Sequence, residues 1–145
     1  MKPLLALVLS VAISASAAQG CEADLLLSKP SVVVLYTPDR ELSQAERNEP
    51  GFTDFIDDFQ TYQMALAAAL KGNRQVQYLV TSAPCVRLKG VQQPVSRKAL
   101  GGFGIVVFVP GKPPAVFEGV ATDADVLCEL HRRLPKAVVA HGCGA

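Results

Sequence analysis

The sequence has no tryptophan, two histidines and no Cys-x-x-Cys pair among its four cysteines. Charged residues are also scarce, at 19%, whereas half of the 145 residues are hydrophobic. This composition excludes an intrinsically disordered chain, which is poor in apolar residues and rich in charge. The 11 glycines and 10 prolines follow no period, which excludes a collagen-like repeat. The length favours one domain, because about 100–200 residues per domain is usual.

No apolar run reaches the ~20 residues that a membrane-spanning helix needs. The N-terminal run, Leu4–Ile13, follows Lys2 and precedes the small residues Ala15-Ser16-Ala17, which is the pattern of a secretory signal peptide. We therefore expect residues 1–18 to be a signal peptide and residues 19–145 to form a single domain. The protein should then be periplasmic or secreted, without spanning a membrane.

A lipid anchor at Cys21 is a second interpretation of the same segment. Bacterial lipoprotein signals usually carry leucine three residues before the modified cysteine and a small residue at the next position. Ala18 and Gln19 occupy those positions here, and only Gly20 fits the pattern. The sequence therefore disfavours lipidation.

All four cysteines, Cys21, Cys85, Cys128 and Cys143, follow the expected signal peptide. An oxidising compartment permits disulfide bonds, and four cysteines allow three pairings with no thiol left over. Four cysteines are too few to replace a hydrophobic core in a chain of this length, so apolar packing must carry most of the stability.

The hydrophobic pattern predicts alternating strands and helices. Apolar runs bounded by proline or glycine predict strands at residues 31–36, 75–80, 105–109 and 115–118, the last two forming a hairpin. Helices are expected from an N-cap at Thr53 to Lys71 and from a cap at Asp123 to about Leu134. The first helix should bury a stripe widened by Met64, and residues 37–52 should form a surface loop with one helical turn at 42–47.

In this βαβ-ββα order the chain resembles the thioredoxin-like superfamily over about residues 31–134. The closest stretch is Gly101–Leu134, which is similar to the C-terminal half of a thioredoxin. The resemblance implies an α/β sandwich with a central mixed four-stranded sheet and flanking helices. The family's functional motifs are missing, because Tyr36-Thr37-Pro38-Asp39 replaces the dithiol motif and Phe103-Gly104 replaces the cis-proline. Ordinary dithiol exchange at that position is therefore excluded, and a fold alone does not give function.

The implied topology also suggests how the cysteines pair. The first core strand begins near the place where the last helix ends, so we expect Cys21 to bridge to Cys143. Cys85 and Cys128 would lie toward the other end of the sheet, on opposite flanks. A second bridge between them requires the loop that carries Cys85 to reach across.

Charge is distributed unevenly along the chain. Residues 39–58 contain seven acids and two bases, whereas residues 59–117 contain seven bases and no acid. One interpretation is a basic face for an anionic protein partner. The other is that the acidic and basic loops partly neutralise each other or are simply solvated. Nucleic acid is excluded as a partner, because the protein is expected to be exported and no aromatic side chains lie among the bases.

Two alternatives assign chemistry to the cysteines. Cys85 lies in an Ala83-Pro84-Cys85 loop near Arg87, which would favour a thiolate and an atypical thiol–disulfide activity. Alternatively, thiolate and imidazole groups could bind zinc or copper. That metal site would consist of Cys128, His131, His141 and Cys143.

Other catalytic patterns are incomplete. The glycines of Gly101–Gly104 open a strand rather than a helix, so they predict conformational freedom and no phosphate site. Ser82, Ser96, Asp123 and His131 include the types of a catalytic triad but no nucleophile elbow. Adjacent Asp57 and Asp58 point about 100° apart on a helix and are expected to be solvated. We therefore expect no catalytic residue and no cofactor. The sequence favours a non-catalytic domain that binds a protein partner or assists assembly.

Overall fold

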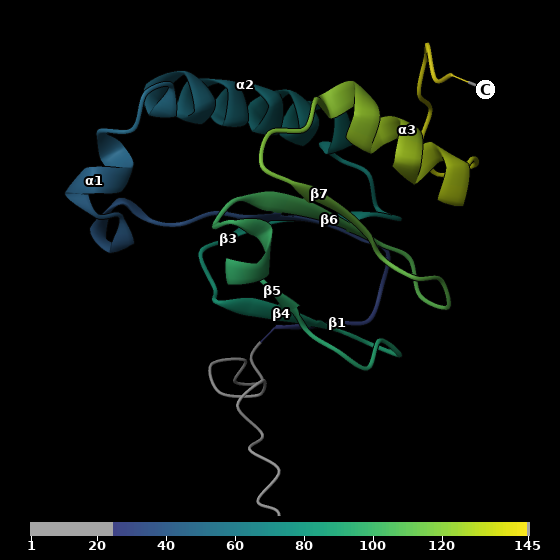
Figure 1. Ribbon diagram of the computed structural model, residues 1–145. Helices are drawn as coiled ribbons and strands as arrows, with labels where there is room; N and C mark the ends of the chain where they lie inside the picture. The colour runs from purple at the N-terminus through teal and green to yellow at the C-terminus, as the bar shows by residue number, and fades with distance from the viewer. Residues whose placement is uncertain (1–24, 145) are drawn as a thin grey trace, which may run out of the picture.

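The computed structural model describes residues 25–144 (Figure 1). The expected signal peptide and Cys21 lie outside these residues. The described chain is a mixed α/β structure with two sheets, which confirms the expected class. The strands are β1 (Leu26–Leu27), β2 (Ser31–Leu35), β3 (Gln77–Thr81), β4 (Cys85–Leu88), β5 (Val95–Ser96), β6 (Gly104–Phe108) and β7 (Ala115–Glu118). The helices are α1 (Gln44–Arg47), α2 (Phe52–Leu70) and α3 (Asp123–Arg133), with 3-10 turns η1 (Asp39–Glu41) and η2 (Lys98–Leu100).

The central sheet has four strands in the order β3-β2-β6-β7. β2 is parallel to β3 and antiparallel to β6, and β7 is antiparallel to β6. Val33 is the central residue of this register, opposite Leu79 on one side and Val106 on the other. The four strands that the apolar runs predict are all present, and their bounds differ by at most two residues.

β2 and β6 are buried on both faces of the sheet, which explains their uninterrupted apolar sequences. Alternate side chains enter two separate cores. Val32 and Val34 pack with Phe59 and Leu66 of α2 and with Val126 of α3. The second core lies on the opposite face and contains Leu27, Val33, Leu35, Val86, Leu88, Leu100, Val106 and Phe108.

The second face is covered by a small sheet in the order β1-β4-β5 and by the turn η2 (Figure 1). β1 pairs in parallel with β4, and β4 pairs antiparallel with β5. The lead-in to the first core strand therefore contains a strand that the sequence pattern did not predict. Two residues are too few to show a strand period, and their partner Arg87 lies far along the chain.

Helix α2 begins at Phe52, with Gly51 rather than Thr53 as its N-cap. Its residues Phe59, Leu66 and Leu70 are buried as expected. Met64 is 70% exposed, so the prediction that it widens the buried stripe is wrong. Met64 follows Phe59 by five residues, which turns its side chain by about 140° around the helix.

The cysteine pairing differs from both expected bridges. Cys128 of α3 is bonded to Cys143, with 5.4 Å between their Cα atoms. The tail folds back onto α3, where His131 Nδ1 donates a hydrogen bond to the carbonyl oxygen of Val138 at 2.6 Å. Cys143 is therefore bonded to the helix that precedes the tail and not to Cys21. Because Cys128 is used in this bond, it does not pair with Cys85.

Candidate functional site

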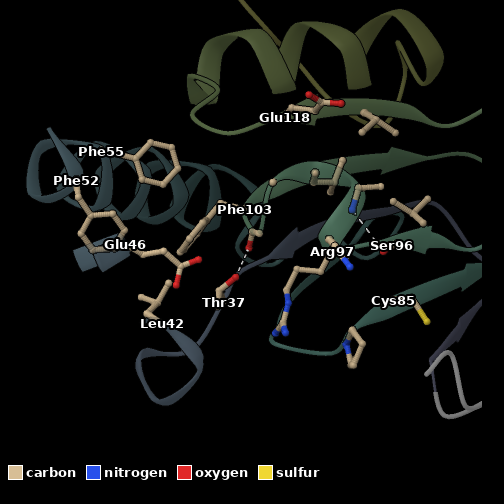
Figure 2. A pocket seen from close by; sticks show the side chains of 18 of the residues that line it. Thr37, Leu42, Glu46, Phe52, Phe55, Cys85, Ser96, Arg97, Phe103 and Glu118 are labelled. Atoms are coloured by element: carbon tan, nitrogen blue, oxygen red, sulfur yellow. Dashed lines mark hydrogen bonds between the residues drawn. The ribbon is translucent and has the colours of Figure 1, made fainter. Parts of the chain in front are cut away.

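An open groove of about 1490 Å³ lies where β2 ends and β6 begins (Figure 2). The loop between β2 and α2 forms one side of the groove, and the segment from β5 to the start of β6 forms the other. The residues that line it include Thr37, Leu42, Glu46, Glu49, Phe52, Phe55, Gln93, Pro94, Val95, Ser96, Arg97, Lys98, Leu100, Gly102, Phe103, Val116 and Glu118. The site is thus built from segments that are far apart in the sequence.

The rings of Phe52, Phe55 and Phe103 contribute to the apolar part of the groove. Phe103 is buried and meets Phe55 edge to face, with 5.2 Å between the ring centroids. Phe59 packs against Phe103 in the same way at 5.3 Å, and this contact anchors Phe103 in the helix-side core. Phe52 and Phe55 are only half-buried, so their rings remain accessible from the groove (Figure 2).

A capping box shapes the acidic side of the groove. The Ser43 side chain accepts a hydrogen bond from the backbone N–H of Glu46, and the Ser43 backbone N–H donates to Glu46 Oε2 at 2.6 Å. This reciprocal pair satisfies the first turn of α1 and fixes the Glu46 side chain. The same hydrogen bonds, that from the Ser43 backbone most of all, lower the pKa of Glu46 from 4.5. Glu46 is therefore a carboxylate at neutral pH.

Arg97 connects three segments beneath the groove. Its guanidinium donates to the carbonyl oxygens of Tyr36, at 3.2 Å, and of Ser82, and it pairs with the carboxylate of Glu41. The Arg97 side chain is only 12% exposed. Its charge is thus neutralised and its donors point into the protein, so Arg97 positions the ends of β2 and β3 and leaves little positive charge for a ligand.

The glycine cluster is explained by close backbone approach. Thr37 Oγ1 donates to the carbonyl oxygen of Gly102 at 2.8 Å. Gly102 has φ +96°, and a Cβ there would lie 2.6 Å from Thr37 Oγ1. At Gly104 a Cβ would lie 2.7 Å from the carbonyl oxygen of Phe117. These glycines let the chain enter β6 against the end of β2, in line with the expected conformational freedom.

The segregation of charge along the sequence is only partly a separation in space, because Arg97 and Lys98 of the basic segment line the groove. The acidic segment with η1 and α1 lies at the groove, where β2 ends. Bases gather at the opposite end of the sheet, where Lys112 Nζ donates to the carbonyl oxygen of Arg133 and Asn73 beside Arg74 donates to that of Ala137. Among residues 25–144, Arg97–Glu41 is the one ion pair that joins the acidic segment to the basic one.

The residues that the sequence suggested for thiol chemistry or a catalytic triad do not form such a site in the structure. Cys85 lines the groove, but it is disulfide-bonded and not the thiolate expected beside Arg87. Ser96 also lines the groove, whereas His131 contacts the C-terminal tail, so the residue types of a triad are not brought together. Asp57 and Asp58 are exposed, as expected for a solvated helix face.

The proposed metal site is contradicted by the cysteine pairing. Cys128 and Cys143 are joined to each other, so neither offers the thiolate that a soft metal prefers. His131 donates from Nδ1 to a backbone carbonyl, and His141 is exposed. Within the part of the chain that the structure describes, no group of three or more His, Cys, Asp or Glu side chains could hold a metal ion.

Comparison of this chain with protein-family models, with curated proteins and with solved structures finds no match. Over residues 25–144, none of the helices combines the length and the apolar character that a bilayer crossing requires.

Sequence reasoning missed most of the groove. In the sequence Arg97 is one of several bases in a basic segment. Its contacts could not be predicted because its partners Ser82, Glu41 and Tyr36 lie 15, 56 and 61 residues away. The Phe103 ring and Glu118 also become site residues only through the pairing of β6 with β2 and β7. The one usable signal was Gly102, because a glycine next to a strand marks a close backbone approach.

Proposed function

We propose that this chain is an exported thioredoxin-like domain without the dithiol motif, and that it binds an extended segment of a partner protein in the groove. The observation that carries the proposal is the groove itself, with accessible phenyl rings on one side and a sheet edge on the other. The role is binding, not catalysis.

The dimensions of the groove suit a peptide segment better than a small metabolite. Small-molecule sites are usually enclosed and occupy about 300–1,000 Å³. This groove is open and occupies about 1490 Å³. An extended peptide can occupy such an open groove, since alternate side chains could reach the rings of Phe52 and Phe55.

β5 offers a second means of attachment. It is an edge strand of the small sheet, and both of its residues, Val95 and Ser96, line the groove. Edge strands bind extended peptides by adding one more strand, in which main-chain hydrogen bonds supply affinity and side-chain pockets supply specificity. The half-buried Phe52 could receive such a side chain.

The family and location assigned in this proposal have separate support. The strand order β3-β2-β6-β7 and the two helices against one face agree with a βαβ-ββα arrangement. The groove lies at the end of β2, where the family's dithiol motif would follow the strand. The Cys128–Cys143 bond is compatible with an oxidising, exported location.

A peptide array can test the proposed binding. Immobilised random twelve-residue peptides are probed with labelled protein, and dissociation constants of the best binders are measured by fluorescence anisotropy. We expect Phe52→Ala to weaken binding about tenfold, which corresponds to the loss of one aromatic contact. Met64→Ala is the matched control, because Met64 is an exposed apolar residue of the same helix outside the groove. An array without binders, or equal losses in both variants, would overturn the proposal.

A further inference from the structure

We propose that the segment bound in the groove is cationic and apolar, with a lysine or arginine next to the residues that contact the phenyl rings. This inference rests on the proposed peptide-binding function and specifies the chemistry of the partner. It follows from which charges of the groove are already neutralised and which remain available.

Acids dominate the available charges. Glu46, Glu49 and Glu118 line the groove and are exposed. Two bases also line it, Arg97 and Lys98, but the Arg97 guanidinium is occupied by Glu41 and by two backbone carbonyls. Lys98 is therefore the only lining base with its charge available among the described residues, against three carboxylates.

The carboxylates approach the groove from different elements. Glu46 comes from α1 and Glu118 from β7, and Phe103 lies between them in the view of Figure 2. A cationic side chain that enters here meets carboxylates and the faces of phenyl rings together. Phenyl rings attract ammonium and guanidinium groups electrostatically, so the apolar and the acidic parts of the groove favour the same kind of ligand.

An anionic partner would be repelled from the groove. At the opposite end of the sheet Lys112 offers a positive charge, whereas the Arg133 guanidinium is paired with Glu129. The balance of available charges in the groove therefore assigns a cationic segment to it, whereas the sequence alone suggested an anionic partner for the basic surface.

Three matched peptides test the inference. Each is an acetylated and amidated octapeptide of alternating valine and serine with one phenylalanine, and its fourth residue is lysine, norleucine or glutamate. Binding to the full mature protein is measured by isothermal titration calorimetry at low and at physiological salt. We expect the lysine peptide to bind about tenfold more tightly than the norleucine peptide at low salt, with a smaller ratio at higher salt. The glutamate peptide should bind most weakly.

Charge-neutral variants assign this preference to the groove. In the double variant Glu46→Gln/Glu118→Gln the lysine and norleucine peptides should bind within twofold of each other, because the lysine peptide loses its advantage. Glutamine at position 46 can still complete the capping box. Asp57→Asn is the matched control, because Asp57 is an exposed acid of α2 outside the groove lining, and it should keep the full lysine preference.

The possible failures are distinguishable. Equal binding of all three peptides would overturn the charge preference and leave the peptide-binding function standing. Preference for the glutamate peptide would overturn the inference in favour of an anionic partner. Loss of that preference in Lys112→Gln would place the anionic partner at the opposite end of the sheet. If no octapeptide and no array peptide binds, both the inference and the proposed function are wrong.

Discussion

The two ends of the central sheet differ in how they are closed. At the far end, where β2 begins and β6 ends, Gln77 N–H donates to the carbonyl oxygen of Pro30 at 2.8 Å. The Asn73 side-chain amide donates to the carbonyl oxygen of Ala137 at 2.9 Å. The Cys128–Cys143 bond also fixes the tail against α3. At the groove end, where β2 ends and β6 begins, the Arg97 guanidinium and the Thr37 hydroxyl connect the loops, and two phenyl rings stay accessible.

This difference indicates a division of roles along one sheet. The far end places polar groups where they restrain the chain, and the Cys128–Cys143 bond holds the tail against α3 outside the groove lining. The groove end leaves apolar surface uncovered, which costs stability unless another molecule covers it. The same β2 and β6 run through both ends, so a rigid sheet can hold an open site at one end because the other end is closed.

The largest expected effect tests whether the two ends share one core. Phe108→Ala should lower the free energy of unfolding by about 3–5 kcal/mol, since it removes a fully buried ring between β6 and the small sheet. Denaturation curves by circular dichroism and by loss of peptide binding should coincide. Two separate transitions would show that the groove end unfolds independently.

The next effect concerns the attachment of the C-terminal tail to α3, outside the groove lining. Replacing both Cys128 and Cys143 by alanine should destabilise the protein by about 3 kcal/mol, because the bond closes a loop of 15 residues. Peptide affinity at 25 °C should stay within twofold of the parent protein. A large loss of affinity without unfolding would contradict the separation of roles.

A smaller effect is expected at the groove end. Arg97→Met keeps the aliphatic stem but removes the donors to Tyr36 and Ser82, and leaves Glu41 unpaired. We expect a loss of about 1–3 kcal/mol in urea denaturation and weaker peptide binding. Arg87→Met, at an exposed position of β4, is the control and should change both quantities little.

The smallest effect is the titration of Glu46. Its folded pKa lies below 4.5, so its contribution to stability is present above 4.5 and is lost as pH falls through the lowered value. Side-chain carboxyl shifts in NMR should show this low titration. Ser43→Ala should raise the pKa of Glu46 part of the way back toward 4.5. Ser43→Pro should raise it further, because proline also removes the backbone N–H that donates to Glu46. An unchanged pKa in Ser43→Pro would exclude the capping box as the cause.

The parts of the fold that the sequence predicts are those with a local signal. The runs around Val32–Leu35 and Ile105–Phe108 are apolar without interruption because both faces are buried, and they were predicted as strands. The strand β1 and the Cys128–Cys143 bond were missed, because each depends on where a short segment docks. The location of the groove also depends on strand pairing, which periodicity alone does not give.

The most direct test of the account maps the lysine octapeptide on the protein by ¹⁵N–¹H correlation spectra during a titration. The account predicts that amide shifts move at Gln93, Val95, Ser96, Arg97, Phe103 and Glu118, which line the groove. The amides of Asn73, Lys112 and Val138 at the far end should stay unchanged. Shifts confined to the far end would contradict it, as would a titration that moves no groove amide.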